Sequence, residues 1–272
     1  MKLAVNYSPQ AAELLDSGQI EFDLYKCTDW PEMVEAARAQ RPVYVHFPLL
    51  AGRRNVEQVG WQRIAGLLDQ TETRYVNTHL APRARDFDGL TVETHDPAYA
   101  EMLAEAMRRD IAPLVKRFGA DRVILELACW DPDPEWQIPR LVLEPEIICR
   151  MVYETGCGFL LDVAHARLNA IQLGMDERDY LARLPVDRLR ELHVTGTGYD
   201  DVKRRYRDHC SMTAGDWALA EWVITRIRRG EWARPWCLAL EYGGMGPHFA
   251  WRSHADVLAK DVPRLYELVR AG

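Results

Sequence analysis

The run LLDVAHARLNA, residues 160–170, ends an apolar stretch with an aspartate and then a histidine three residues later. A buried strand has no use for an unpaired carboxylate, because burying an isolated charge is costly or forces the group to neutralise. Asp162 must therefore either cap the segment that follows or point into a site. His165, one helical turn further along, is placed to face the same pocket.

Other ionisable side chains also stand at the ends of short apolar runs. They are His46, His79, Glu126, His193 and Glu241, followed by Asp208 and His209 in the segment RYRDHC. Five of the eight histidines lie at or just after such an end. Carboxylates and imidazoles gathered in one place need a cation, and a divalent metal ion would offset the cost of removing them from water. The pattern predicts metal binding.

The number of donors predicts two or three ions. One ion would take the donors at the ends of the fifth to eighth runs: Glu126, Asp162, His193 and Glu241. His46 and His79 would hold a second ion, with Glu126 bridging. A third ion would be held by His165 with Asp208 or His209. Mixed nitrogen and oxygen donors suit iron, manganese or zinc better than magnesium or calcium, which prefer oxygen shells.

Eight short apolar runs alternate with helical patterns along the chain. The runs are 2–7, 20–25, 42–47, 75–80, 122–127, 158–163, 189–194 and 236–241. Helical patterns cover 31–40, 55–70, 96–119, 143–156, 175–184, 215–230 and 253–272. Such alternation predicts parallel strands covered by helices. Eight units in 272 residues fit a single α/β domain, 1–272, folded as a (β/α)8 TIM barrel, whose usual size is about 250 residues.

A doubly wound sheet is the competing fold. It would be favoured by a glycine-rich G-x-G-x-x-G turn after the first strand. The turn here reads NYSPQAAEL and contains no glycine. We therefore expect the barrel, in which function lies at the carboxyl ends of the strands. The residues listed above occupy those ends.

The amino-acid composition limits the binding partners and the cellular compartment that we expect. The 34 basic and 41 acidic residues give a formal charge of −7, which argues against nucleic acid as a partner. Six scattered cysteines without a C-x-x-C pair predict free thiols in a reducing compartment. The start MKLAVNYSPQ has no signal-peptide core, and no apolar run reaches the ~18 residues of a membrane span. We expect a cytoplasmic protein that does not enter membranes.

The strand-end set resembles a known superfamily. Glu126, Asp162-x-x-His165, His193 and Glu241 are similar to the metal-binding residues of the xylose isomerase-like TIM barrels, which include sugar epimerases and endonuclease IV. The resemblance covers nearly the whole chain in the order of its elements. Within that superfamily the segment EPEIICRMVYETGCGFLLDVAHARLNA, 144–170, resembles the multinuclear-iron barrels that modify ribosomally made peptides, such as the methanobactin-biosynthesis oxidase.

The resemblance implies a ligand set and marks two departures. It implies metal ligation by His46, His79, Glu126, Asp162, His193, His209 and Glu241, with Asp208 as a further candidate. The peptide-modifying family usually has asparagine in place of His165, which instead follows the endonuclease IV and epimerase pattern. That family also spaces its loop pair D-x-H, whereas Asp208 and His209 are adjacent here.

The favoured hypothesis is an iron-dependent enzyme that uses O2 to oxidise a peptide or a small thiol-containing substrate. It follows from the resemblance of 144–170 and from the surplus of histidines. The substrate's cysteine sulfur would occupy an open iron position. Members of the family that modify peptides often need a partner protein, and we expect one to deliver the peptide here.

A sugar isomerase or epimerase is the second hypothesis. Glu126 and Glu241 would hold one manganese ion and exchange protons with a carbon next to a carbonyl, on opposite faces of the substrate. His165 and Arg207 would bind hydroxyl or phosphate groups. Glu126, Glu241 and His165 are therefore the predicted catalytic residues. His46 and His79 would contact substrate and hold no metal.

Two further hypotheses are weaker. A three-zinc phosphodiesterase acting on abasic DNA would need phosphate contacts, but KRRYR at 203–207 is the one basic run after the predicted strands. A barrel that binds metal for stability or partner recognition has no need for six strand-end ligands on the functional face.

Substrate contacts are predicted for four residues beyond the strand ends: Lys26, Trp130, Arg207 and Tyr242.

Overall fold

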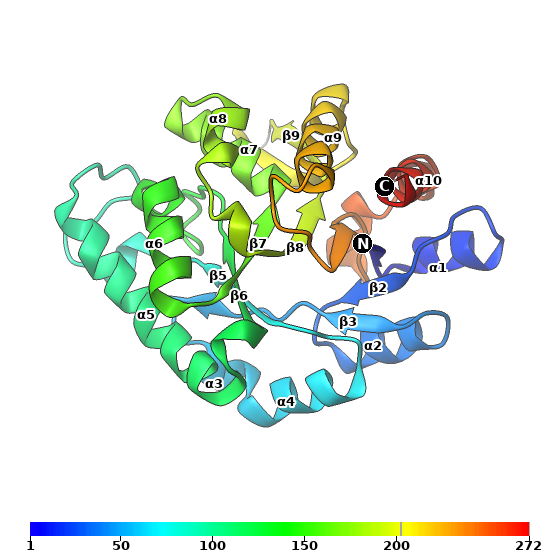
Figure 1. Cartoon of the computed structure of the whole chain (residues 1–272), viewed down its shortest axis with the longest axis horizontal. Helices are drawn as coiled ribbons and strands as arrows, with labels where there is room; N and C mark the ends of the chain where they lie inside the picture. Colours follow the sequence, from blue (N-terminus) through cyan, green and yellow to red (C-terminus); the bar gives the residue numbers. More distant parts are fainter. Residues whose placement is uncertain (202, 272) are drawn as a thin grey trace. The chain divides into compact units, whose positions relative to one another are not determined.

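The computed structural model describes residues 1–201 and 203–271. The chain divides into two compact units. Unit 1 contains Met1–His46, Leu67–Arg74 and Arg190–Gly272, and unit 2 contains Phe47–Gly66 and Tyr75–Leu189. Both units alternate strands with helices (Figure 1). In the described part of the chain no helix is long and apolar enough to cross a membrane.

Parallel strands form the centre of unit 1. In hydrogen-bonding order they are β3 (Val43–Val45), β2 (Leu24–Cys27), β1 (Lys2–Asn6), β11 (Cys237–Leu240) and β8 (Leu189–Val194). Ala4 is in register with Leu24 on one side and Ala239 on the other. These three residues pack with Tyr44 and Cys237 in a fully buried apolar cluster. The next strand in register places His193 beside Ala239.

Four helices lie in the described part of unit 1: α1 (Pro9–Asp16), α2 (Pro31–Arg38), α9 (Ala214–Arg228) and α10 (Ala255–Arg270). Two of them, α1 and α9, are capped by side chains at their N-termini. Ser8 accepts a hydrogen bond from the N–H of Ala11 at the start of α1. Thr213 and Asp216 form a reciprocal capping box at the start of α9. Side-chain oxygens at these positions satisfy N–H groups that have no partner within the helix.

A hairpin follows β8 in unit 1. Its strands are β9 (Gly196–Asp200) and β10 (Arg205–Cys210), which pair antiparallel. The segment RYRDHC, read from sequence as a loop, is thus a strand. The strand could not be recognised from sequence, because its residues do not alternate between apolar and polar. Its side chains are mostly partly exposed, so no apolar face is required.

Unit 2 repeats the same parallel arrangement. Its strands, in hydrogen-bonding order, are β7 (Gly158–Asp162), β6 (Val123–Leu127), β5 (Val76–Leu80) and β4 (Leu50–Ala51). Its helices are α3 (Val56–Val59), α5 (Ala98–Phe118), α6 (Pro145–Thr155), α7 (Val163–Leu173) and α8 (Glu177–Ala182), and α4 (Trp61–Gln70) begins in it. In Figure 1, α5 and α6 lie side by side along these strands. Short 3-10 turns complete the chain: Ala84–Asp86, Ala120–Arg122, Arg140–Leu143, Val186–Arg188 and Pro247–Arg252.

All eight predicted apolar runs contain a strand, but two expectations need correction. The second strand begins at Leu24 rather than residue 20, because the Asp23 carboxylate accepts the Leu3 N–H (2.7 Å) where a strand partner would otherwise bond. The predicted helix 55–70 is broken into α3 and α4 at Gly60, whose φ of 90° suits glycine alone.

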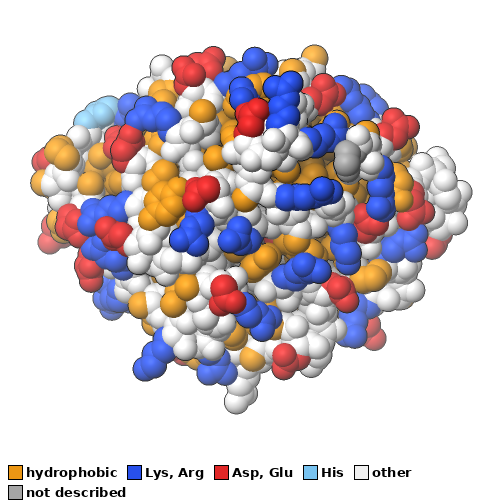
Figure 2. All heavy atoms as spheres, in the orientation of Figure 1, with side chains coloured by type: hydrophobic (Ala, Val, Ile, Leu, Met, Phe, Trp, Pro, Cys, Tyr) orange, Lys and Arg blue, Asp and Glu red, His pale blue; other side chains and the backbone are white. Residues whose placement is uncertain are grey.

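The surface carries charged side chains of both signs (Figure 2). On the face drawn in Figure 2, basic and acidic side chains are interspersed rather than gathered by sign. Many of them form ion pairs, such as Arg108 with Glu101 and Glu154.

All six cysteines are free thiols. Burial raises the pKa of Cys27 to about 12 and that of Cys237 well above its ordinary value, so these two are unreactive at neutral pH.

Candidate metal centre

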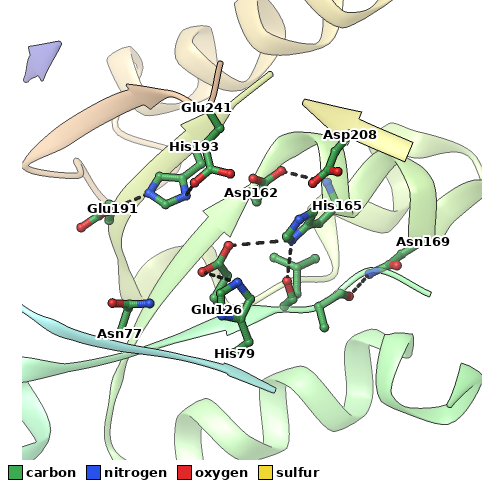
Figure 3. Close-up of polar contacts among 12 residues, drawn as sticks. Asn77, His79, Glu126, Asp162, His165, Asn169, Glu191, His193, Asp208 and Glu241 are labelled. Carbon is green, nitrogen blue, oxygen red and sulfur yellow. Dashed lines mark hydrogen bonds and ion pairs between the residues drawn. The ribbon is translucent and has the colours of Figure 1, made fainter. Parts of the chain in front are cut away.

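The donors of unit 2 surround Glu126. Glu126 is on β6, is 1% exposed, and lies in register with His79 of β5. The Nε2 atom of His79 is 3.1 Å from Glu126 Oε2, and Figure 3 shows the imidazole turned toward this carboxylate. The parallel register explains the contact, because residues paired across two strands present their side chains on the same face.

Asp162 and His165 complete this set from the junction of β7 and α7. Asp162 Oδ1 accepts the backbone N–H of His165 (2.8 Å) and so caps α7. The ring Nδ1 of His165 lies 2.9 Å from the Leu127 carbonyl oxygen and 3.8 Å from Glu126 Oε1. A carbonyl only accepts, so Nδ1 carries the proton and Nε2 carries the lone pair that could bind a metal. Glu126, Asp162 and His165 offer ligand atoms within 4.8 Å of one another.

Asp162 caps the helix that follows, and it also belongs to a group of side chains that could hold a metal ion. Its fully buried carboxylate caps a helix with one oxygen and belongs to a group of donors. The helix N-terminus, with its exposed N–H groups, also favours a negative charge there.

Substitution at Asp162 separates the two roles. Asp162→Ser keeps an N-cap oxygen, so we expect metal-free protein to unfold with nearly native free energy, whereas Asp162→Ala should lose about 1 kcal/mol. Both variants should bind less metal, since both lack the carboxylate. Urea unfolding and elemental analysis measure the two effects. Native metal content in Asp162→Ser would show that Asp162 is a cap alone.

The donors of unit 1 surround His193. His193 is on β8, is fully buried, and its Nδ1 lies 2.9 Å from Glu241 Oε1. Its Nε2 lies 2.7 Å from Oε1 of Glu191, two residues earlier on the same strand. The His46 ring stands 5.3 Å from that of His193, centroid to centroid. His46, Glu191 and His193 form another group of ligand atoms within 4.8 Å.

Lys26 lies against this set rather than in open solvent. Its ammonium on β2 is 7% exposed and contacts Glu241 Oε1 directly. A buried carboxylate needs a positive partner, and Lys26 supplies one. The residue predicted to contact substrate is thus paired with a predicted metal ligand.

Asp208 and His209 come together through a β-bulge. Between Arg207 and Cys210 the register with β9 shifts, and His209 takes a φ of 55°. In a regular strand, adjacent side chains point to opposite faces, but the extra residue of a bulge redirects one of them. As a result His209 Nε2 is 3.3 Å from Asp208 Oδ2, while its Nδ1 donates to the Glu241 carbonyl oxygen (2.8 Å). The bulge gives an adjacent pair the proximity that D-x-H spacing gives on a regular strand.

The three other predicted substrate contacts have different surroundings. Arg207 pairs with Asp200 (3.2 Å) and stacks on the Trp251 ring at 4.0 Å. Trp130 is half-buried, and its backbone N–H donates to Asn169 Oδ1 (3.2 Å). Tyr242 is 3% exposed, and burial raises the pKa of its hydroxyl.

The sequence interpretation overlooked two buried polar residues that support the donors. Glu191 bonds His193, and Asn169 bonds the backbone of Ala128 and Trp130 just after β6. The signal for Glu191 was the alternation E-x-H in LRELHV, which puts both side chains on one face of the strand. Asn169 had no signal beyond a polar residue within an apolar helix.

These observations define an α/β protein with buried histidine–carboxylate donor sets on parallel strands. Its fold matches a sugar phosphate isomerase/epimerase from Parabacteroides distasonis, with a TM-score of 0.54, 11% identity and 98% coverage of both chains. This likeness shows the fold alone, which is that of a TIM barrel.

The chain belongs to the family described as RiPP precursor modification enzyme MbnB/TglH/ChrH, whose model matches residues 24–232. A UPF0276 protein of Acaryochloris marina is 28% identical over 202 residues, 71% of this chain and 69% of that protein. One from Bordetella pertussis is 45% identical over 53 residues, 20% of this chain. The latter match spans only 18% of the Bordetella protein's length. Of the predicted ligands, Glu241 alone lies beyond the matched span.

Proposed function

We propose that this protein is a metal-dependent enzyme that modifies a peptide, and that the modification is an iron-dependent oxidation of a peptide or small thiol-containing substrate. The observation that carries the proposal is Glu126, a carboxylate 1% exposed with an imidazole on either side. Membership of a family that modifies peptide precursors supports the choice of substrate.

The donor chemistry fits iron. The ions would be held by His79, Glu126, Asp162 and His165 in unit 2, and by His46, His193, Asp208, His209 and Glu241 in unit 1. Imidazole nitrogens mixed with carboxylate oxygens suit iron, manganese and zinc. A bound cation would help to offset the cost of burying the Glu126 and Asp162 carboxylates in a low-dielectric interior. Bound iron would supply the one-electron and O2 chemistry that no side chain supplies.

The surrounding residues orient the donors and handle charge. The Leu127 carbonyl fixes the ring of His165, and the bulge in β10 fixes the ring of His209. Lys26 neutralises Glu241 in the metal-free protein. A metal ion at Glu241 would compete with Lys26 for the negative charge of this carboxylate and so weaken their ion pair. The Lys26 ammonium could then also bind a carboxylate or carbonyl of the peptide.

Metal analysis tests the proposal. Protein expressed with iron, manganese and zinc all supplied should contain two or three irons per chain, and its visible spectrum should show a ligand-to-metal charge-transfer band. Incubation with a cysteine-containing peptide should then change the peptide's mass in air but not under anaerobic conditions. One colourless manganese per chain would favour a sugar isomerase, and three zinc ions a phosphodiesterase. Absence of metal after reconstitution would overturn the proposal.

A further inference from the structure

We propose that Glu191 is a positioning residue that fixes the proton of His193 on Nε2, so that Nδ1 is offered to the metal ion. The inference rests on the proposed function, since it concerns how one ligand of that centre is prepared. His193 and Glu191 are both on β8, two residues apart, and therefore on the same face.

Both oxygens of Glu191 already accept hydrogen bonds within unit 1. Oε1 lies 2.7 Å from His193 Nε2, and Oε2 accepts the indole N–H of Trp236 at 3.0 Å. A carboxylate only accepts, so the nitrogen facing it must carry the proton. The other ring nitrogen, Nδ1, faces Glu241 Oε1, 2.9 Å away. A metal ion bound by Glu241 would therefore lie beside Nδ1, and Nδ1 could bind it in place of a proton while Nε2 stays protonated against Glu191.

The position of Glu191 is itself fixed by packing. Trp236 stacks edge-on against the buried Tyr44, with ring centroids 5.1 Å apart, and the Arg74 guanidinium lies 5.1 Å from its ring centre. Glu191 is 3% exposed and His193 is fully buried. A hydrogen bond to a charged acceptor is strong in such surroundings. Carboxylates that orient metal-bound histidines typically account for about 10- to 100-fold in metal affinity.

The alternative role for Glu191 is direct ligation, since it belongs to a group of donors with His46 and His193. Ligation would place the metal ion on Oε1 or Oε2, in addition to the hydrogen bonds with His193 and Trp236. The two roles predict different effects on metal binding when the Glu191 carboxylate is removed. Loss of a ligand lowers the number of ions bound, whereas loss of a positioning residue weakens binding at an unchanged number of sites.

Glu191→Gln is the test variant, because glutamine keeps the size but has one acceptor oxygen for two N–H donors. Trp236→Phe removes only the second hydrogen bond and should have a smaller effect of the same kind. Asp216→Asn is the matched control: Asp216 is also a buried carboxylate of unit 1, but it caps α9. Iron and cobalt titrations give the number and affinity of sites. Nitrogen-15 spectra of histidine in the metal-free protein give the tautomer of His193.

We expect Glu191→Gln to bind the native number of ions about 10- to 100-fold more weakly, with an altered cobalt absorption spectrum and a changed His193 tautomer. Asp216→Asn should bind metal as the native protein does. Native affinity, spectrum and tautomer in Glu191→Gln would overturn the inference, as would loss of a whole ion. If the native protein itself binds no metal, the proposed function fails instead, and the tautomer measurement still reports on Glu191.

Discussion

Glu126→Gln is expected to abolish metal-dependent activity and to weaken metal binding by more than about 100-fold, beyond the loss typical of residues that only orient a ligand. Each oxygen of Glu126 has a histidine within 4 Å, His79 at 3.1 Å and His165 at 3.8 Å. The glutamine amide is neutral and has one oxygen. It therefore cannot replace a carboxylate whose two oxygens are proposed to bind two metal ions. The measurements are metal content after dialysis and turnover of a cysteine-containing peptide.

Thermal unfolding separates a ligand from a structural residue at this position. A ligand that binds only the folded state raises its stability, so native protein should melt at a higher temperature when iron is added. Metal-free Glu126→Gln should be about as stable as metal-free native protein, because glutamine keeps a hydrogen-bonding group beside His79 and removes a buried charge. Iron should raise its melting temperature less than it raises that of the native protein, because at least one ion is lost. Glu144→Gln, the same change at a half-buried position of unit 2, is the control.

A lower melting temperature for metal-free Glu126→Gln together with native metal content would show that Glu126 serves packing. The isomerase hypothesis makes a different forecast, since it places one manganese at Glu126 and Glu241. Under it, both Glu126→Gln and Glu241→Gln would lose the same single ion. Under the iron hypothesis each variant should retain part of a two- or three-ion content.

The strand ends could be predicted because their signal is local. Each parallel strand is a short apolar run, and the polar residue that ends it stands out against that run, as Glu126 does in VILEL and Asp162 in GFLLD. Parallel strands align their carboxyl ends, so these polar residues could be expected at the same edge of the sheet. The contact between His79 and Glu126 follows from the register of β5 with β6.

What could not be predicted depends on contacts between residues distant in sequence. Lys26 and Glu241 are 215 residues apart, and no local pattern shows that they touch. The bulge that unites Asp208 with His209 depends on pairing with β9. α7 was not predicted because it is buried on nearly every side, which removes the polar face that marks an amphipathic helix.

Asn169→Ala is the substitution expected to destabilise the fold most, through the loop that follows Glu126. Asn169 is fully buried on α7. Its Nδ2 donates to the Ala128 carbonyl oxygen (2.9 Å) and to the Tyr180 hydroxyl (3.3 Å), and its Oδ1 accepts the Trp130 N–H (3.2 Å). Alanine would leave the Ala128 and Trp130 backbone groups without these partners, at about 1–3 kcal/mol for each.

Alanine's better helix propensity returns at most about 0.7 kcal/mol, so we expect a net loss of roughly 3 kcal/mol in the free energy of unfolding. At about 2–4 °C per kcal/mol for a chain of this size, the melting temperature should fall by roughly 6–12 °C. Gln172→Ala, a change at an exposed hydrogen bond on the same helix, should alter it little. Chemical denaturation of the metal-free proteins measures both.

The metal affinity of Asn169→Ala tests whether the loop after β6 helps to hold the metal-binding side chains in place. Residues 128–130 begin one residue after β6 ends at Leu127, and Leu127 also supplies the carbonyl that orients His165. Loosening the loop should therefore weaken metal binding in the folded variant, with every ligand still present. Native affinity in a destabilised Asn169→Ala would show that β6 alone holds Glu126 and His165 in place. Weakened affinity would show that the rigidity of the fold beyond the strand ends keeps the donors within reach of one ion.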